Sequence, residues 1–396
     1  MCWWRMRVEG DVTRTTSGIL LKPERSNVSI HSLRWGENPK ASIKIMSVLK
    51  IAKNSLLATK GLGTFALVSG SAFRRNRLLI LCYHGISMGD EHGSHPEMFM
   101  PPATFARRMD KLNQLGCNVL GLTEALSRLR AGSLPPRSVA LTFDDGWADF
   151  HKEAFPILRK HGFPATVYLT TYYCLFNRPI FRFALGYMCW KRQGNVVQNN
   201  AQAWLPGELD LQTTESRAAL LRQINDYAQQ KNLSGKEKDD LAAQIAALVG
   251  FDYPAFLRER LMHLMNPAEV TEVSNGGIDI QLHTHRHRTP LDRTQFIAEI
   301  EENRRVINDL AGSDGAHFCY PSGAVRTDFV SWLRDAGVQS ATTCNQGFSS
   351  GKTNPFLLPR LLDQCGISDN EFEAWITGFA AFMPKRRLTS PDVAPE

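Results

Sequence analysis

The sequence predicts an α/β fold in which a parallel sheet or barrel carries helices on its outside. From Leu78 onward, short apolar runs alternate with stretches that have the apolar spacing of amphipathic helices. The predicted strands are 78–83, 139–143, 165–169, 278–282, 318–320 and 340–343. The predicted helices are 104–115, 149–161, 293–311 and 327–336. In folds of this kind, functional residues gather at the carboxyl ends of the strands.

The regular alternation of strands and helices stops between about residues 175 and 276, where the sequence predicts a helical insertion. Ser234 and Glu237 form a capping box at the start of one helix. Asn266-Pro267 marks the start of a second helix, because proline is favoured at the first helical position. Insertions of this kind often shape a substrate cleft, and a structural cap without substrate contact is an equally good alternative.

Composition and charge are those of a globular protein, with 43% apolar and 21% charged residues in 396. The net charge of the whole chain is +7. Residues 1–80 contain 14 Lys and Arg against 4 Asp and Glu, a net charge of +10. Residues 81–396 therefore carry 32 − 35 = −3. A nearly neutral main part argues against a nucleic-acid partner. The basic N-terminus predicts a weak, peripheral attraction to an anionic membrane surface.

Three regions are expected along the chain: a basic, poorly ordered segment 1–73, a catalytic domain 74–384 and a polar tail 385–396. An uncharged run, 61–73, follows several lysines and resembles part of a signal peptide, but it is too short to span a bilayer. The eight cysteines lack metal-type spacing and suggest a reducing compartment. We therefore expect a cytoplasmic protein, with export as the alternative if translation starts at Met46.

Two short motifs carry the chemistry. Asp144-Asp145-Gly146 ends one apolar run, and His283 and His287 follow another. One Asp and two His can bind a divalent metal of the zinc class and leave a position open for water. The other Asp can then accept the proton of that water. Asp-Asp-Gly is also ordinary turn chemistry, but both motifs follow predicted strands, which favours metal-assisted hydrolysis.

With these motifs in place, the chain resembles the polysaccharide deacetylases, also called carbohydrate esterase family 4 or the NodB-homology domain. Thr-Phe-Asp-Asp-Gly (142–146) matches the first motif of that family, and the stretch 154–170 looks like its usual continuation. His283-Thr284-x-x-His287 matches the second motif and residues 318–323 match the third. The resemblance implies a distorted (β/α) barrel with a divalent metal, zinc first, that removes N-acetyl or O-acetyl groups from sugars.

The resemblance also implies a role for each matching residue. Asp144 would be the general base. The metal would be held by Asp145, His283 and His287. The candidates for contacts with the substrate, the oxyanion or the base are Tyr320, Ser322 and Arg360.

The sequence departs from the common family pattern at two positions. The usual arginine of the third motif is replaced by Cys319, and no histidine follows His317 to act as the usual acid. Cys82-Tyr83-His84-Gly85 resembles the N-terminal Tyr-His of the poly-N-acetylglucosamine deacetylase branch, so His84 is the candidate acid. Arg360 is the candidate for the missing guanidinium. A packed histidine and an ordinary surface arginine are the alternatives for these two residues.

Three functions remain open at this point. The leading hypothesis is a hydrolase that cleaves a linear amide, removing N-acetyl groups from a sugar in a glycan, a glycan precursor or an oligosaccharide. The second is an O-acetyl esterase acting on an acetylated polysaccharide. The third is a catalytically degenerate glycan-binding protein, against which the complete set of two carboxylates and two histidines argues.

Overall fold

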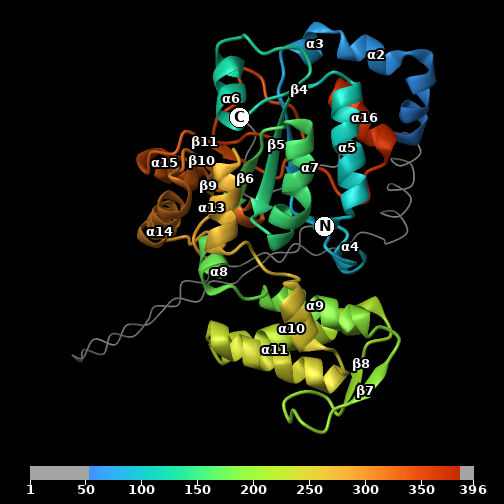
Figure 1. Cartoon of the computed structure of the whole chain (residues 1–396), viewed down its shortest axis with the longest axis vertical. Helices are drawn as coiled ribbons and strands as arrows, with labels where there is room; N and C mark the ends of the chain where they lie inside the picture. Colours follow the sequence, from blue (N-terminus) through green and yellow to red (C-terminus); the bar gives the residue numbers. More distant parts are fainter. Residues whose placement is uncertain (1–52, 384–396) are drawn as a thin grey trace, which may run out of the picture.

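The computed structural model describes residues 53–383 and places eight strands in one parallel, curled sheet (Figure 1). The strands lie in the order β11-β10-β9-β6-β5-β1-β12, and β4 pairs with β5. Their bounds are β1 Leu79–Tyr83, β4 Asn118–Val119, β5 Ser138–Asp145, β6 Thr166–Leu169, β9 Asp279–Leu282, β10 His317–Cys319, β11 Ser340–Thr342 and β12 Leu361–Leu362. The predicted parallel arrangement is confirmed, as a distorted (β/α) barrel.

The sheet curls until its two ends approach each other. An isolated parallel bridge joins Thr342 of β11 to Leu358, three residues before β12. Side chains alternate along each strand, so Leu79, Leu81 and Tyr83 of β1 pack outward into the main core. Ile80 faces the concave side, where a smaller apolar cluster closes the floor. This alternation leaves the polar side chains of the concave side to collect at one edge of the sheet.

Most helices of the barrel lie on the outside of the sheet, as predicted. They are α5 Pro102–Gln114, α7 Phe155–His161, α13 Pro267–Asn275, α14 Arg293–Ala311, α15 Thr327–Asp335 and α16 Asp369–Thr377, and α6 Leu122–Arg130 packs over the floor. The bounds of α14 are those predicted. The predicted helix 149–161 begins with a π-helical turn, Phe150–Ala154, before α7. The short helix α4 Glu91–Ser94 and the two-residue strands β2 Gly85–Ile86 and β3 Phe99–Met100 lie between β1 and α5.

The region of the expected insertion forms a lobe with a core of its own, seen below the sheet in Figure 1. Its elements are α8 Thr171–Phe176, α9 Phe181–Lys191, β7 Val196–Gln198, β8 Glu208–Asp210, α10 Thr214–Gln230, α11 Gly235–Val249 and α12 Tyr253–Glu259. The strands β7 and β8 form an antiparallel hairpin, which the sequence did not indicate. Capping boxes at Ser234 and Asn266 start α11 and α13, as predicted.

The last part of the expected N-terminal segment belongs to the folded body. Thr59–Leu62, α2 Thr64–Ser69 and α3 Ala72–Arg75 are helical, and Leu57 and Phe65 are buried in the main core. For residues 53–73 this differs from the expectation of poor order, because apolar side chains in that run pack against the end of the chain, with the rings of Phe65 and Phe379 4.7 Å apart. Residues 1–52, including Met46, and the tail 384–396 lie outside the described residues.

No helix between residues 53 and 383 combines the length and the apolar character needed to cross a membrane. The attraction of the basic N-terminus to a membrane surface and the cytoplasmic location stay predictions.

Candidate active site

The carboxyl ends of neighbouring parallel strands bring the predicted acidic and histidine side chains to one edge of the sheet. His84 directly follows β1, and His283 directly follows β9. The sequence predicted that Asp144 and Asp145 come just after the strand. In the structure they are the last two residues of β5. The expected clustering at strand ends is otherwise what the structure has.

A change of backbone conformation directs two adjacent carboxylates to one place. In a regular strand, neighbouring side chains point to opposite faces. Asp145 has a φ of 71°, in the left-handed region that Asp tolerates better than most residues. Thr284 and His287 also have positive φ, 62° and 55°. Each such residue costs roughly 1–3 kcal/mol, and clusters of them are typical of functional sites.

Asp145, His283 and His287 converge on one point. The Nε2 atoms of both histidines lie 3.2 Å from Oδ1 of Asp145. Ligands at about 2.0–2.2 Å from a tetrahedral ion lie about 3.3–3.6 Å from each other, so the three donor atoms have nearly the spacing that an ion requires. Burial would raise the pKa of Asp145, but hydrogen bonds from the two histidines hold it well below its usual range, and the carboxylate is ionised.

Neighbouring groups fix the orientation of two of these three side chains, His283 and Asp145. Nδ1 of His283 donates to the carbonyl oxygen of Cys319 at 2.8 Å, so its Nε2 is free to act as a ligand. Nε1 of Trp147 donates to Oδ2 of Asp145 at 3.1 Å, and the backbone N–H of His283 donates to Oδ1 of Asn303 at 2.9 Å. Support of this kind is typical of metal ligands. The residues present therefore fit a divalent ion with nitrogen and oxygen ligands.

Asp144 lies in a buried pair with Arg360. Nη1 of Arg360 donates to Oδ1 and Nη2 to Oδ2, each at 2.7 Å, and the side chains are 5% and 1% exposed. Burial would raise the pKa of Asp144, but the charge and hydrogen bonds of Arg360 hold it well below its usual range. Arg360 is itself held, since its Nε donates to the carbonyl oxygen of Thr343 at 3.1 Å. The carboxylate is therefore ionised and fixed in orientation.

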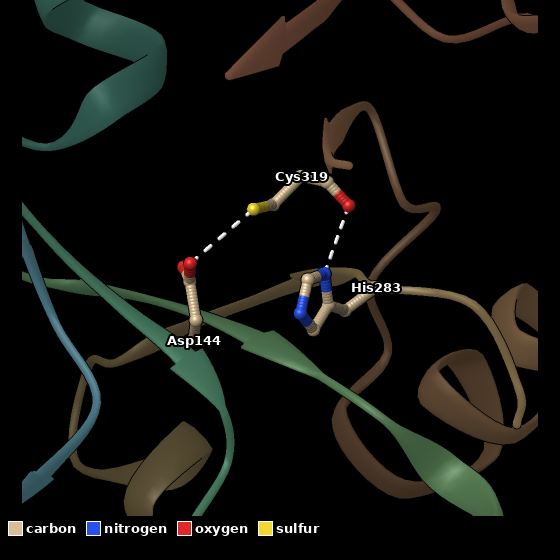
Figure 2. Close-up of side chains that lie close together, drawn as sticks. All are labelled: Asp144, His283 and Cys319. Atoms are coloured by element: carbon tan, nitrogen blue, oxygen red, sulfur yellow. Dashed lines mark hydrogen bonds between the residues drawn. The ribbon is translucent and has the colours of Figure 1, made fainter. Parts of the chain in front are cut away.

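Asp144, His283 and Cys319 form a second group of close donor atoms. Figure 2 shows the thiol of Cys319 directed at the carboxylate of Asp144, at 3.4 Å from Oδ2, and its carbonyl directed at His283. Both oxygens of Asp144 already accept hydrogen bonds from Arg360. A divalent cation at this second group would lie beside the guanidinium and be repelled by it. The group around Asp145 is therefore the better metal site.

His84 also approaches Oδ2 of Asp144. Its Nε2 lies 3.9 Å from Oδ2 of Asp144, and its side chain is 16% exposed. Its Nδ1 is buried and has no hydrogen-bond partner among residues 53–383. Cys82, two residues earlier on the same face of the chain, has its thiol 3.5 Å from Oδ2. His84 is thus a partly exposed imidazole close to the candidate base.

Tyr320 and Ser322 of the third motif, two candidates for contacts with the substrate, the oxyanion or the base, have no contact with Asp144 or Asp145 among the hydrogen bonds of residues 53–383. Tyr320 is 1% exposed and donates its hydroxyl to the carbonyl oxygen of Phe356 at 3.1 Å, within the outer core. Because Cys319 faces the concave side, its neighbour Tyr320 must face outward, so a contact between the Tyr320 side chain and substrate does not fit. Ser322 lies in a tight turn with a φ of 58°, and the described residues give its hydroxyl no hydrogen bond.

A cleft of about 680 Å³ opens beside Asp145 and His287. Its opposite wall comes from the insertion, with Phe181 and Phe183 of α9 and Arg222 of α10. This volume is in the range of small-molecule sites, about 300–1,000 Å³. The insertion therefore borders the cleft at the candidate ligands and does not only cap the barrel.

Trp147 is the main site residue that the sequence reasoning missed. Besides its hydrogen bond to Asp145, its ring packs edge to face on Phe183 of α9, with ring centres 5.1 Å apart. It thus connects a candidate ligand to the core of the insertion. Its position two residues after Asp145 was the available signal, because a tryptophan just past a catalytic strand end is close to the site whichever way it turns.

Comparison with known proteins assigns the family. A family model described as polysaccharide deacetylase matches residues 131–230 and 249–341. These ranges contain β5 with both aspartates and the loop with both histidines. The chain belongs to the polysaccharide deacetylase family. His84 and Arg360 lie outside the matched ranges, so their assignment depends on the geometry of this chain itself.

Individual relatives match this chain at low identity or over short lengths. The Bacillus subtilis (strain 168) protein YxkH, whose name describes a polysaccharide deacetylase, is 34% identical over 94 residues, 24% of this chain and 32% of YxkH. The matched part thus spans about a third of that relative. Streptococcus pyogenes deacetylase PplD, solved with acetate, is 17% identical with a TM-score of 0.50, over 78% of this chain and 99% of PplD. IcaB from Ammonifex degensii is 17% identical with a TM-score of 0.47, over 76% and 97%.

Proposed function

We propose that this protein is a metal-dependent hydrolase that removes N-acetyl groups from an N-acetylated sugar in a glycan, a glycan precursor or an oligosaccharide. The observation that carries the proposal is the convergence of Asp145, His283 and His287 beside a second ionised carboxylate, Asp144. A glycan-binding protein needs no such carboxylate next to a metal set. The name of the Bacillus relative supports a polysaccharide as the substrate.

Zinc is the metal we expect, held by Asp145, His283 and His287, because one carboxylate and two imidazoles are a typical catalytic zinc set with an open position. When bound, such an ion polarises a carbonyl group and lowers the pKa of a water molecule. Trp147 and the carbonyl of Cys319 keep the ligands in place.

Asp144 accepts the proton that water loses as it adds to the acetyl carbon. Arg360 contributes by donating a hydrogen bond to each carboxylate oxygen, so that the group does not rotate out of reach. His84, whose Nε2 lies 3.9 Å from Oδ2 of Asp144, gives a proton to the nitrogen as the carbon–nitrogen bond breaks. The products are acetate and the free amine of the sugar.

The test combines metal analysis with acetate release. Purified full-length protein is assayed on N-acetylglucosamine oligomers, peptidoglycan fragments and O-acetylated xylan, before and after chelation and after addition of zinc. We expect one metal per chain and release of acetate from an N-acetylated glycan that stops on chelation and returns with zinc. Release from xylan alone would identify an O-acetyl esterase. Release that survives chelation, or none on any glycan, would overturn the proposal.

A further inference from the structure

A second cavity, of about 470 Å³, lies on helix α10 of the insertion. Its side chains from that helix recur every three or four residues, which places them on one face. The cavity is lined by Trp204, Arg222, Gln223, Asp226, Tyr227 and Gln230, among others. One face of a helix thus presents an acid, a base, two amides and an aromatic ring to the same space.

Two aromatic rings in this cavity stack face to face. The ring centres of Trp204 and Tyr227 are 3.8 Å apart and their planes differ by 7°. Trp204 is also fixed by hydrogen bonds, since its Nε1 donates to Oε1 of Gln202 at 3.0 Å and its carbonyl accepts from Nε2 of Gln223 at 3.1 Å. A platform that is already ordered loses little conformational entropy when it binds a ligand.

The second cavity adjoins the cleft at the candidate ligands, because Arg222 and Asp226 line both. Both side chains are exposed, and among residues 53–383 neither has an ion-pair partner. The cleft on the other side contains Asp145 and His287. A single extended ligand can therefore pass from Asp145 over the edge formed by Arg222 and Asp226 to the ring of Trp204.

The chemistry of the second cavity suits a sugar. A pyranose ring has an apolar C–H face that packs on an aromatic side chain and a rim of hydroxyl groups that both donate and accept hydrogen bonds. Asp226 and the amide oxygens accept such bonds, while Arg222 and the amide nitrogens donate them. The charges of Arg222 and Asp226 balance, which favours a neutral chain over a polyanion such as a nucleic acid.

We propose that this face of α10 is a distal carbohydrate subsite, which binds sugar units of the same chain whose acetylated unit lies at Asp145. The inference rests on the proposed function for its substrate class and adds to it a preference for chains over single sugars. The unit at Asp145 then needs neighbours in the chain, and their binding at Trp204 holds it in place.

The test measures binding to chelated protein, where no acetate is released, so it gives an answer even if the proposed activity is wrong. The probes are dimers and hexamers of N-acetylglucosamine with β-1,4 and β-1,6 links, titrated calorimetrically into the full chain. We compare the natural protein with Trp204→Ala and with Gln230→Ala, an exposed change that leaves the ring stack alone. Glu215→Ala, exposed in the first turn of α10 and outside both cavities, is the matched control.

We expect one of the hexamers to bind about tenfold more tightly than its dimer, and Trp204→Ala to remove most of that difference. Gln230→Ala should lower hexamer affinity by a smaller factor, and Glu215→Ala should not change it. Hydrolysis of 4-nitrophenyl acetate by the zinc-loaded protein should be the same in the natural protein and in Glu215→Ala. Equal affinity for dimer and hexamer, no binding of either hexamer, or variants with unchanged hexamer affinity would overturn the proposal. Unfolding curves check that each variant is folded.

Discussion

Asp144 and Asp145 are neighbours in sequence but belong to two different regions of the molecule. Asp144 lies in the buried floor of the concave side, where Arg360 binds both of its oxygens. Asp145 lies at the rim, where it faces two histidines and Trp147 and borders the cleft. One strand end thus supplies a carboxylate fixed by a single cation and another left available to an ion.

The difference shows how one motif can serve two roles. In the floor, the positive partner of Asp144 is the side chain of Arg360, so the carboxylate stays ionised without a bound metal ion. At the rim, the imidazole nitrogens of His283 and His287 face the carboxylate, which is an arrangement that a divalent cation completes. The two regions should therefore respond differently to substitution: the floor in stability and proton transfer, the rim in metal content.

The largest effect is expected at the rim, for His283→Ala. Removing one of three ligands should strip the metal and abolish acetate release together, because two ligands hold a divalent ion poorly. Metal content by mass spectrometry and acetate release are measured on the same sample. His285→Ala is the control, since that ring bonds Thr171 at 2.8 Å and is not part of the set. A fully loaded His283→Ala protein would contradict the ligand assignment.

In the floor, Arg360→Met should destabilise the fold by about 3–5 kcal/mol, because it leaves the charge of Asp144 buried without a partner. The free energy of unfolding in urea measures this loss. The double variant Arg360→Met with Asp144→Asn removes both charges and should regain part of the stability. If Arg360→Met alone unfolds like the natural protein, the buried pair does not hold the floor together.

The sequence predicted the parts of these regions that follow local patterns better than the part that depends on contacts between distant residues. The strand ends, the two aspartates and the histidine loop follow local patterns, and the sequence placed them correctly. Arg360 was only a candidate, since its position depends on β12, a strand of two residues that pairs with β1 across 280 positions of sequence. No local periodicity marks so short a strand. Only the closure of the sheet brings its guanidinium to Asp144.

The outward direction of the Tyr320 side chain was hard to predict for a different reason. Residues 318–320 were predicted as a strand, but a strand prediction does not say which face each residue occupies, and a shift by one residue exchanges the faces. The positive φ of Asp145 was also beyond local patterns, although it decides that both carboxylates face the site. The Trp204 loop and its hairpin lacked any marked alternation of apolar residues.

A third group faces the floor, and His84→Ala tests its role. If His84 donates a proton to the leaving nitrogen, its loss should slow amide hydrolysis by about two to four orders of magnitude. Hydrolysis of an activated ester should slow far less, because its leaving group departs without a proton. Acetate release from an N-acetylglucosamine oligomer and from 4-nitrophenyl acetate is compared at equal metal content. Equal loss on both substrates would mean that His84 is structural.

The smallest effect concerns His263, which lies where the rim meets the insertion. Burial lowers its pKa from 6.5 to about 4, and its ring is 4% exposed. The folded state therefore favours the neutral ring, so stability is full above about pH 6.5 and is lost as the pH falls toward 4, by about 3 kcal/mol at most. His263→Gln should flatten this decline in urea unfolding between pH 7 and 4. An identical decline in the variant would assign the acid sensitivity to other groups.

The most direct test compares Asp144→Asn with Asp145→Asn in one experiment, with metal content and acetate release measured on each. Asp144→Asn should keep about one metal per chain and lose roughly two to four orders of magnitude in turnover, since it removes the base and spares the ligands. Asp145→Asn should lose the metal itself. If Asp144→Asn loses the metal and Asp145→Asn keeps it, the two neighbouring carboxylates have the opposite roles.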